Sequence, residues 1–387
     1  MQNLSTSRVR DVNLRSLMDN KLHVSLLEDW QQVSRLQGEW NTLLRQSRSD
    51  SLFLTWEWIS AWATIAQQTT KPLIICVRNT SEELLGIAPF YLTTLRLKGG
   101  ISYRVLRVMA DYATGAEYPD WIVRVDVEAA VSQAIADTLI RIGQRWDCLW
   151  MPNVAGWTGA VDRILRPCQE QRLLWRSRPC EFGAVPLPDT MDLYVRSLSS
   201  NKRQQMKAEQ KRFRAKQSLV IQRCQNAEQL PRLLDALFDL HYRRWQVRGE
   251  EGSFRRKPQL VEFYKQFVPR ALMKGWLWLF GLQDQGDYKA IQLGYVYNHV
   301  FHQIQEGFDP EYEPGAGNFL RAYIIEACTT AGIRTFDFLG EMTEHKRRWL
   351  AEKRVGCDLF IGQRKLKNRP LFSLGIWPTG RFLRPTA

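Results

Sequence analysis

The 387-residue sequence predicts an α+β protein with a mixed α/β sheet, built as two tandem copies of one arrangement. Two observations predict this fold class. Short apolar runs with the period of strands are interspersed with longer amphipathic runs of helical period. These segments follow the order β-α-α-β-β-β-α-β-α-β twice, although the two halves share little residue identity. We therefore expect domains at residues 21–178 and 191–366, a linker at 179–190, and tails at 1–20 and 367–387.

The first half begins after a tail that lacks the apolar core of a secretory signal. Asp29 is a suitable N-cap for the first helix. The next helix is rich in aromatic residues, and Trp58 and Trp62 share one face of it. Core packing and a sugar-stacking wall are both open interpretations of that face. Strands are expected at residues 22–27, 73–78, 84–95, 103–110, 118–123, 148–153 and 174–177, and helices at 30–46, 53–66, 127–143 and 159–171.

The second half follows a segment, residues 178–188, that holds three prolines and one glycine, a composition typical of a linker. It ends in the stretch from Phe301 to Trp349, which predicts strand, glycine turn, helix, strand and helix. Strands are expected at residues 219–224, 276–283, 289–297, 300–308, 334–340 and 357–363, and helices at 191–198, 201–217, 227–248 and 257–273, with two more after the glycine turn and after residue 340.

The net charge of +14 favours a polyanionic partner: a coenzyme with phosphates, nucleic acid or an anionic membrane surface. The seven cysteines are scattered without a Cys-x-x-Cys pair, as expected of reduced thiols in a cytoplasmic protein. No apolar run reaches about 18 residues, so we expect no transmembrane segment. His299 and His302 point to opposite faces of a strand, and we expect no metal site.

Pro314, Gly315, Ala316, Gly317 and Asn318 form a glycine turn between a strand and a helix. Backbone N–H groups at a helix start, where the helix dipole is positive, bind phosphate. The alternative is an ordinary turn in which proline and glycine only redirect the chain. The matching turn of the first half, VRVDVEAA, has no glycine and two acids. We therefore expect a coenzyme only in the second half.

Four segments of the chain carry a resemblance to a known family. The second half resembles the GNAT-type acetyltransferase domain of the CelD/BcsL group, which is linked to polysaccharide biosynthesis and is related in fold to the Fem-type aminoacyl transferases. FLTWEWISAW in the first half also resembles the aromatic helix of that family. The segments are SLSSNKR with Ser197, Ser199, Lys202 and Arg203; LHYRRWQVRGEEGSF with His241, Arg244, Trp245, Gly249, Gly252 and Phe254; PGAGNFL with Gly317 and Leu320; and FDFLGEMTEHKRRW with Asp337, Glu341, Lys346 and Trp349.

The resemblance implies two tandem GNAT-like domains, the first of them degenerate. It implies an acetyltransferase with acetyl-CoA as co-substrate and a sugar or polysaccharide precursor as the acceptor. One departure is that Gly340-Glu341 stands where the family has an Arg-Gly pair and an acid. The residues expected at the site are Glu341, His241 and Asp337 for catalysis; Gly307, Phe308, Pro314, Gly315, Ala316, Gly317 and Asn318 for the coenzyme; and Lys202, Arg203, Arg244, Trp245 and Lys346 for the substrate.

The position of each catalytic candidate in its strand or helix bears on whether it acts in catalysis or has another role. Glu341 follows an apolar strand, where it can take a proton from an attacking amine or hydroxyl, especially if burial raises its pKa. Its alternative is an acid that stabilises a helix N-terminus. Asp337 alternates with Phe336 and Phe338, so it faces away from the apolar side of its strand. His241 lies beside an apolar helix stripe, where packing or hydrogen bonding is the alternative to catalysis.

Other features leave further functions open. Residues 201–217 carry seven basic residues and one acid, which fits a solvated helix, an anionic acceptor, tRNA or peripheral association with a membrane. The loop DYATGAEYPD, with Asp111, Tyr112, Tyr118 and Asp120, is a candidate rim for the acceptor. A Fem-like transferase that uses charged tRNA and a non-catalytic module that binds polysaccharide or anions remain alternatives. Motifs of serine hydrolases, P-loop NTPases and zincins are absent from the sequence.

Overall fold

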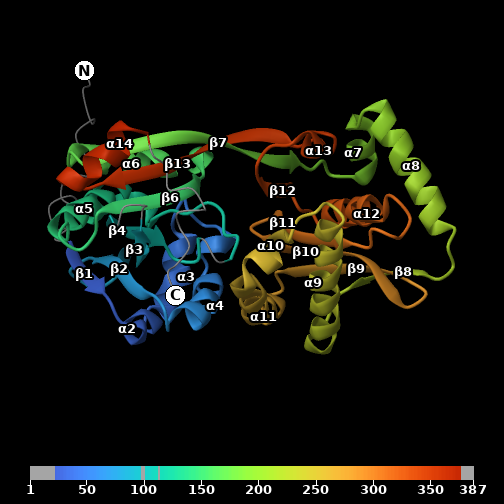
Figure 1. The fold of residues 1–387 in the computed structure, drawn as a ribbon, viewed down its shortest axis with the longest axis horizontal. Coiled ribbons are helices and arrows are strands. Elements are labelled where there is room, and N and C mark those ends of the chain that lie inside the picture. Colours follow the sequence, from blue (N-terminus) through green and yellow to red (C-terminus); the bar gives the residue numbers. More distant parts are fainter. Residues whose placement is uncertain (1–21, 97–100, 112–113, 376–387) are drawn as a thin grey trace, which may run out of the picture.

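The computed structural model describes residues 22–96, 101–111 and 114–375 of the chain. Across these residues, thirteen strands form one mixed sheet in the order β1-β2-β3-β4-β6-β13-β7-β12-β11-β10-β9-β8, with β5 paired to β3. Helices lie on both sides of this sheet (Figure 1). The expected mixed α/β fold class is therefore confirmed. The expected N-terminal tail lies outside the described residues, as does the last part of the chain from residue 376.

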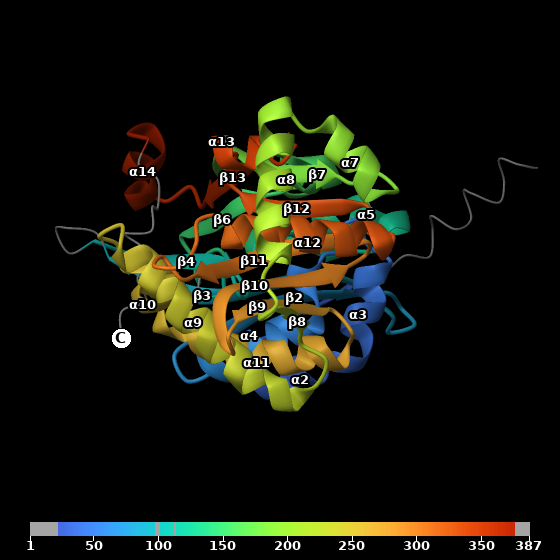
Figure 2. The same ribbon diagram turned by 90° about the vertical axis from the view of Figure 1, so that its right-hand side faces the viewer.

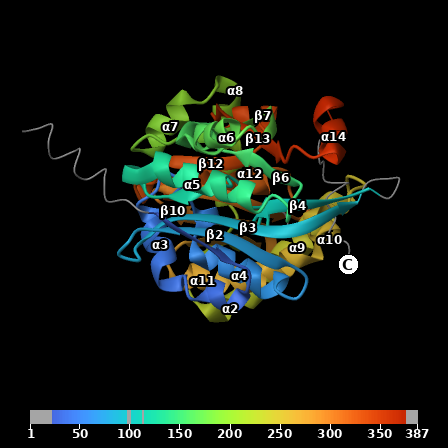
Figure 3. The same ribbon diagram turned by 90° about the vertical axis from the view of Figure 1, so that its left-hand side faces the viewer.

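The first half contains the expected order of elements. One expected helix, residues 30–46, is broken in two at Arg35 and Leu36. Figure 3 shows α5 and α6 on one side of this part of the sheet and α2, α3 and α4 on the other. The elements are β1 (His23–Leu27), α2 (Trp30–Ser34), α3 (Gln37–Arg45), α4 (Trp56–Ala66), β2 (Lys71–Arg78), β3 (Leu84–Arg96), β4 (Ser102–Val108), β5 (Ile122–Val123), α5 (Glu128–Arg141), β6 (Cys148–Val154), α6 (Ala160–Glu170) and β7 (Leu174–Pro186).

The second half repeats that order after two leading helices. Figure 2 shows α12 and α8 on one side of its strands and α9 and α11 on the other. The elements are α7 (Met191–Ser197), α8 (Ser200–Arg214), β8 (Leu219–Arg223), α9 (Leu230–Gln246), α10 (Gly252–Arg256), α11 (Pro258–Met273), β9 (Leu277–Asp284), β10 (Asp287–Tyr297), β11 (Val300–Phe308), α12 (Ala316–Thr330), β12 (Thr335–Gly340), α13 (Glu344–Arg347), β13 (Glu352–Gly362) and α14 (Arg369–Ser373).

The two halves exchange their last strands. Strand β7 pairs with β12 of the second half, and β13 pairs with β6 of the first half. The exchanged strands also pair with each other, over all of β13 and from Leu174 to Ala184 of β7. The expected linker at 179–190 is therefore wrong, because residues up to Pro186 belong to a central strand. Its prolines are tolerated since Pro179 lies where β7 pairs on one side only, and Pro186 is its last residue.

The aromatic helix α4 packs in the core between the halves. Trp58 is fully buried, and its ring lies 4.8 Å from that of Phe263 and 4.5 Å from that of Phe267, both on α11. The Trp58 indole N–H donates to Thr114 Oγ1 at 3.2 Å. Trp62 is also buried. This geometry supports the core interpretation of the aromatic face over a sugar-stacking wall.

The described part of the expected C-terminal tail is bound to the first half. Lys365 and Lys367 both donate to the buried Asp147, at 2.8 and 2.7 Å. On the helix that follows, the ring of Phe372 stacks on that of Phe360 at 4.7 Å. The segment from residue 367 to 375 is thus part of the fold, which corrects the expectation of a tail there. No helix in the described part of the chain is long and apolar enough to cross a membrane.

Candidate active site

Strands β11 and β12 separate close to the boundary between the halves. They pair in parallel only from Val300 to His302 and from Thr335 to Asp337. A bulge at Ile304 of β11 lies next to that point, because consecutive residues of β10 pair with Gln303 and Gln305. In β12, the pairing with β7 is irregular between Asp337 and Gly340. We call this region the split. The carboxyl ends of strands in open α/β sheets are the usual place for ligands.

Asp337 lies buried at the start of the split and is held by both halves. Tyr118 donates to Asp337 Oδ2 at 2.9 Å, and the Leu339 N–H donates to Oδ1 at 2.8 Å. His302 Nδ1 lies 3.7 Å from the same carboxylate. Burial works against its ionisation, but His302, Leu339 and Tyr118 outweigh burial and hold the pKa of Asp337 below its usual value. Asp337 is therefore an ionised, positioned carboxylate.

Glu117 lies next to this carboxylate and was not among the residues expected from sequence. Its Oε2 is buried and has no hydrogen-bond partner among the described residues. Its Oε1 lies 3.0 Å from the place where a Cβ on Gly340 would stand. Burial, followed by the charge of Asp337, raises the pKa of Glu117 to about 8. A carboxyl that titrates near neutral pH is suited to proton transfer. Its only sequence signal was its place in the polar-aromatic loop DYATGAEYPD.

Lys346 and Glu341 lie on the other side of the split. Lys346 Nζ donates to the carbonyl oxygens of Leu339, at 3.0 Å, and Gly340. Burial lowers the pKa of Lys346, while the charges of Asp337 and Glu117 oppose that change. Glu341 is exposed, in the loop between β12 and α13. The structure thus places Lys346 with the carboxyl groups of Asp337 and Glu117 and leaves Glu341 in contact with solvent.

A cluster of cations surrounds Glu306 at the end of β11. Arg244 Nη1 contacts Glu306 Oε1 at 2.9 Å, and Arg321 forms an ion pair with Oε2. His345 Nε2 lies 3.1 Å from Arg321 Nη1. Burial disfavours the charged form of Glu306, but the two guanidinium groups outweigh it and lower the pKa of Glu306 to about 2. Glu306 is therefore ionised, and the guanidinium groups of Arg244 and Arg321 give the cluster more than one positive charge.

Lys202 extends this cluster from α8. Its Nζ lies 3.8 Å from the centre of the Trp349 ring, and the Arg321 guanidinium lies 5.2 Å from the same ring. Burial lowers the pKa of Lys202 to about 8. The structure thus brings together Lys202 and Arg244 of the expected substrate residues. Arg203 instead donates to the carbonyl of Leu198, within its own helix start.

His241 and Trp245 form a separate group on α9. The Trp245 indole N–H donates to His241 Nε2 at 3.0 Å, and Ser253 Oγ lies 3.1 Å from the same nitrogen. Burial lowers the pKa of His241 to about 4. A Cβ on Gly307 would stand 2.6 Å from the backbone nitrogen of His241. Gly307 therefore allows α9 to lie directly on β11 at His241.

The glycine turn lies under helix α8. Gly315 is the N-cap of α12 with φ +96°, and a Cβ there would stand 2.7 Å from Glu209 Oε1 of α8. Asn318 donates to that oxygen at 3.4 Å, and Arg212 donates to the Pro314 carbonyl. The start of α12 thus faces a buried carboxylate. A phosphate at this turn would be repelled by the negative charge of Glu209, although the Arg212 guanidinium lies 3.1 Å from the same Cβ position.

Other expected residues lie close to these groups. Phe308 lies under the Arg244 guanidinium, 4.8 Å from it, and within van der Waals reach of Gly317. Ala316 is buried in the first turn of α12. Asp120 forms a buried ion pair with Arg163 at 2.6 Å, which anchors the loop that carries Glu117. Tyr112 of the expected acceptor rim lies outside the described residues.

Comparisons with known proteins agree with the fold. Residues 200–347 match the family model described as an acetyltransferase (GNAT) domain. The FemX crystal structure is similar, with a TM-score of 0.62 at 11% identity over 87% of this chain and 98% of that one. L-PGS from Bacillus licheniformis is also similar, with a TM-score of 0.51 at 10% identity over 87% of this chain and 94% of that one. No curated protein matches the sequence.

A third similar structure is a conserved protein of unknown function from Bacteroides thetaiotaomicron VPI-5482. Its TM-score is 0.53 at 12% identity, over 88% of this chain and the whole of that one. At these identities the likeness concerns the fold alone. The second half thus matches the GNAT acetyltransferase domain in sequence, and the whole chain shares its overall fold with the three proteins named here.

Proposed function

We propose that this protein is an acyltransferase that moves an acyl group onto an amino or hydroxyl group at the split between β11 and β12. One observation carries the proposal: the split brings Glu117 of the first half, with its buried Oε2 atom, next to Asp337 and Lys346 of the second. A carboxyl with a pKa of about 8 beside an ionised carboxylate and a lysine is a pattern of general acid–base sites.

Three residues at the split have different roles in acyl transfer. The acceptor nitrogen or oxygen attacks the acyl carbonyl carbon, the new C–N or C–O bond forms, and the bond to the donor breaks. Ionised Glu117 takes the proton that the acceptor loses. Asp337, held by Tyr118 and Leu339, keeps the pKa of Glu117 high through its negative charge. Lys346 fixes the backbone carbonyls of β12 through its hydrogen bonds.

Glu117 and Glu341 make a matched pair for testing the proton acceptor. Glu117→Gln removes the proposed base and is expected to lower turnover by about 10²–10⁴. Glu341→Gln makes the same carboxylate-to-amide change at an exposed residue. It is expected to leave turnover within about twofold of the parent. Acetyl-CoA with glucosamine as acceptor, followed by thiol release, supplies the first assay. Loss in Glu341→Gln with full turnover in Glu117→Gln would assign the base to Glu341.

Two donors are supported by different observations. The match of residues 200–347 to the GNAT acetyltransferase domain supports acetyl-CoA, with a sugar or polysaccharide precursor as acceptor. The carboxylate of Glu209 against the glycine turn supports an aminoacyl-tRNA donor, which does not need a phosphate at that turn.

Binding measured by calorimetry distinguishes acetyl-CoA from charged tRNA as the donor. If acetyl-CoA is the donor and binds at the turn, Glu209→Ala removes the opposing charge and should tighten its binding about tenfold. If charged tRNA is the donor, it should bind the parent protein in a salt-sensitive manner and Glu209→Ala should leave that affinity unchanged. Binding of neither donor, together with no turnover, would contradict the proposal and favour a non-catalytic binding module.

A further inference from the structure

Helix α8 lies at one end of the molecule and carries much of the excess positive charge of the chain. Figures 1 and 2 show it across the tip of the second half, outside α12. Residues 191–223 contain nine lysines and arginines and two acids, a net +7 of the total +14. Lys207 and Lys211 are exposed and form no ion pair with any residue the structure describes. Their charge is therefore free to meet an external partner.

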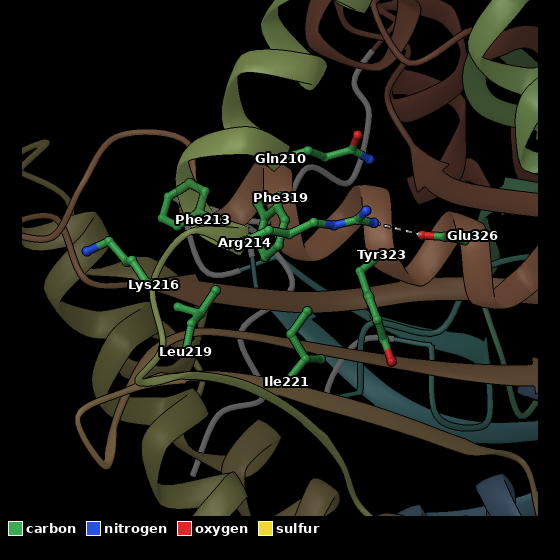
Figure 4. Close-up of a pocket in the computed structure, with 9 residues that line it drawn as sticks. All are labelled: Gln210, Phe213, Arg214, Lys216, Leu219, Ile221, Phe319, Tyr323 and Glu326. Atoms are coloured by element: carbon green, nitrogen blue, oxygen red, sulfur yellow. Dashed lines mark ion pairs between the residues drawn. The ribbon is translucent and has the colours of Figure 1, made fainter.

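A groove runs beside this helix. Its volume is about 360 Å³, and it lies between α8, β8 and α12 (Figure 4). The rings of Phe213 and Phe319 stack at 5.0 Å on its α8 side, and Leu219 and Ile221 of the edge strand β8 line the opposite side. Arg214 extends over the groove and pairs with Glu326 at 3.9 Å. The groove is thus lined by apolar side chains together with polar and charged ones.

A large side chain stands exposed next to the groove. Tyr323 of α12, which lines the groove, is 40% exposed. We define the α8 surface as Lys207, Lys211, Arg214 and Tyr323. An exposed aromatic group and a partly apolar groove beside cations are the pattern of surfaces that lie on anionic membranes, where lysines meet headgroups and apolar groups enter the interface.

We propose that the α8 surface docks onto an anionic lipid bilayer, with Tyr323 entering the interface and the groove accepting part of an acyl chain. Nucleic acid is less well matched, because single strands are bound by exposed aromatic rings between cations. The aromatic residue of α8, Phe213, is fully buried. This inference does not depend on acyl transfer at the split, since none of the four residues belongs to it.

Vesicle co-sedimentation tests the proposal with the full chain. Vesicles of phosphatidylcholine alone are compared with vesicles containing about one fifth phosphatidylglycerol. Binding is expected only to the second kind, and it should weaken as salt rises because the exposed lysines are screened. Each lysine near such a surface adds about a fivefold gain in partition, so Lys207→Glu with Lys211→Glu should weaken binding by at least about 30-fold.

A matched control reverses two other exposed arginines without touching the α8 surface. Arg35→Glu with Arg369→Glu makes the same change in net charge, and it should weaken binding less than about threefold. Tyr323→Ser should lower binding several-fold at unchanged salt dependence, because it removes apolar contact and no charge. Circular dichroism checks that each variant folds.

Three results would overturn the proposal. Equal binding to the two kinds of vesicle would remove the role of charge. If the lysine double variant and the arginine double variant lost vesicle binding equally, binding would depend on net charge alone. Binding of transfer RNA that the lysine pair abolishes, with no binding to either vesicle, would assign the α8 surface to RNA.

Discussion

Tyr118 of the first half donates a hydrogen bond to Asp337 of the second half across 2.9 Å. Both residues are buried, and the exchange of strands β7 and β13 joins the halves next to them. The first half therefore contributes side chains to the split as well as supporting the fold. A degenerate copy that only stabilised its partner would not need to place Glu117 and Tyr118 there.

Tyr118→Phe removes one donor to a buried carboxylate and should lower the free energy of unfolding. Hydrogen bonds to charged groups contribute about 1.5–3 kcal/mol, so a loss in that range is expected in urea denaturation. Tyr323→Phe is the matched control, because the Tyr323 hydroxyl is on an exposed residue and has no partner among the described residues. It should change the same quantity by less than about 0.5 kcal/mol. Equal effects of the two substitutions would contradict the role of the Tyr118 hydroxyl.

The pKa of Glu117 makes stability depend on pH in a defined direction. Its folded-state pKa of about 8 is above the ordinary value for glutamate, so the folded state binds the extra proton between the two values. The contribution of Glu117 to the free energy of unfolding is fully present at low pH and is lost as pH rises through about 8. Glu117→Gln cannot lose a proton, so its unfolding free energy should rise relative to the parent between about pH 5 and 8. Parallel curves for parent and variant would rule out the raised pKa.

The order of elements in both halves was predictable because each segment carries a local period of apolar residues. Strand exchange was not, since pairing between β7 and β13 depends on contacts between segments almost two hundred residues apart. The three prolines of residues 178–188 suggested a linker, but Pro179 lies where its strand is paired on one side only, and Pro186 lies at its end. Local composition carries no information about which side of a strand is paired.

The candidate site was predictable in part. The sequence pointed to Asp337, Lys346, Lys202 and Arg244, and the structure gathers them near the split in two groups. It did not point to Glu117, because the burial that raises its pKa comes from the other half of the chain. The glycine turn was correctly placed before α12, whereas the approach of Glu209 from a separate helix had no local signal.

Gly315 and Gly317 should respond in opposite directions to alanine. Gly315→Ala forces a side chain onto φ +96° and against Glu209, and should cost about 1–3 kcal/mol of unfolding free energy. Gly317 lies within α12, where a Cβ meets only Phe308 at an ordinary 3.5 Å. Gly317→Ala should therefore stabilise by about 0.5–1 kcal/mol. In a Glu209→Ala background the cost at Gly315 should fall but not vanish, because the backbone strain remains. Thermal unfolding of the five proteins gives these comparisons.

His241 should titrate far below an ordinary histidine. Burial lowers its pKa to about 4, and Trp245 donates to the nitrogen that would take up a proton. In spectra of the chain with labelled histidine, the resonance lost in His241→Gln should have a midpoint near pH 4, against about 6.5 for an unperturbed imidazole. Trp245→Phe removes the competing donor and should move that midpoint upward. A midpoint near 6.5 in the parent would contradict the neutral, buried state.

The pKa of about 4 bears on whether His241 packs in the interface or takes part in catalysis. Because its folded-state pKa is depressed, the stability that it contributes is present above about pH 6.5 and is lost as pH falls towards 4. A base with a pKa of about 4 accepts a proton poorly at neutral pH, so packing is the favoured role. His241→Gln should therefore lower the free energy of unfolding at pH 7 while leaving turnover at the split within about threefold. A loss of turnover as large as that expected for Glu117→Gln, in a variant that melts like the parent, would make His241 part of the catalytic machinery.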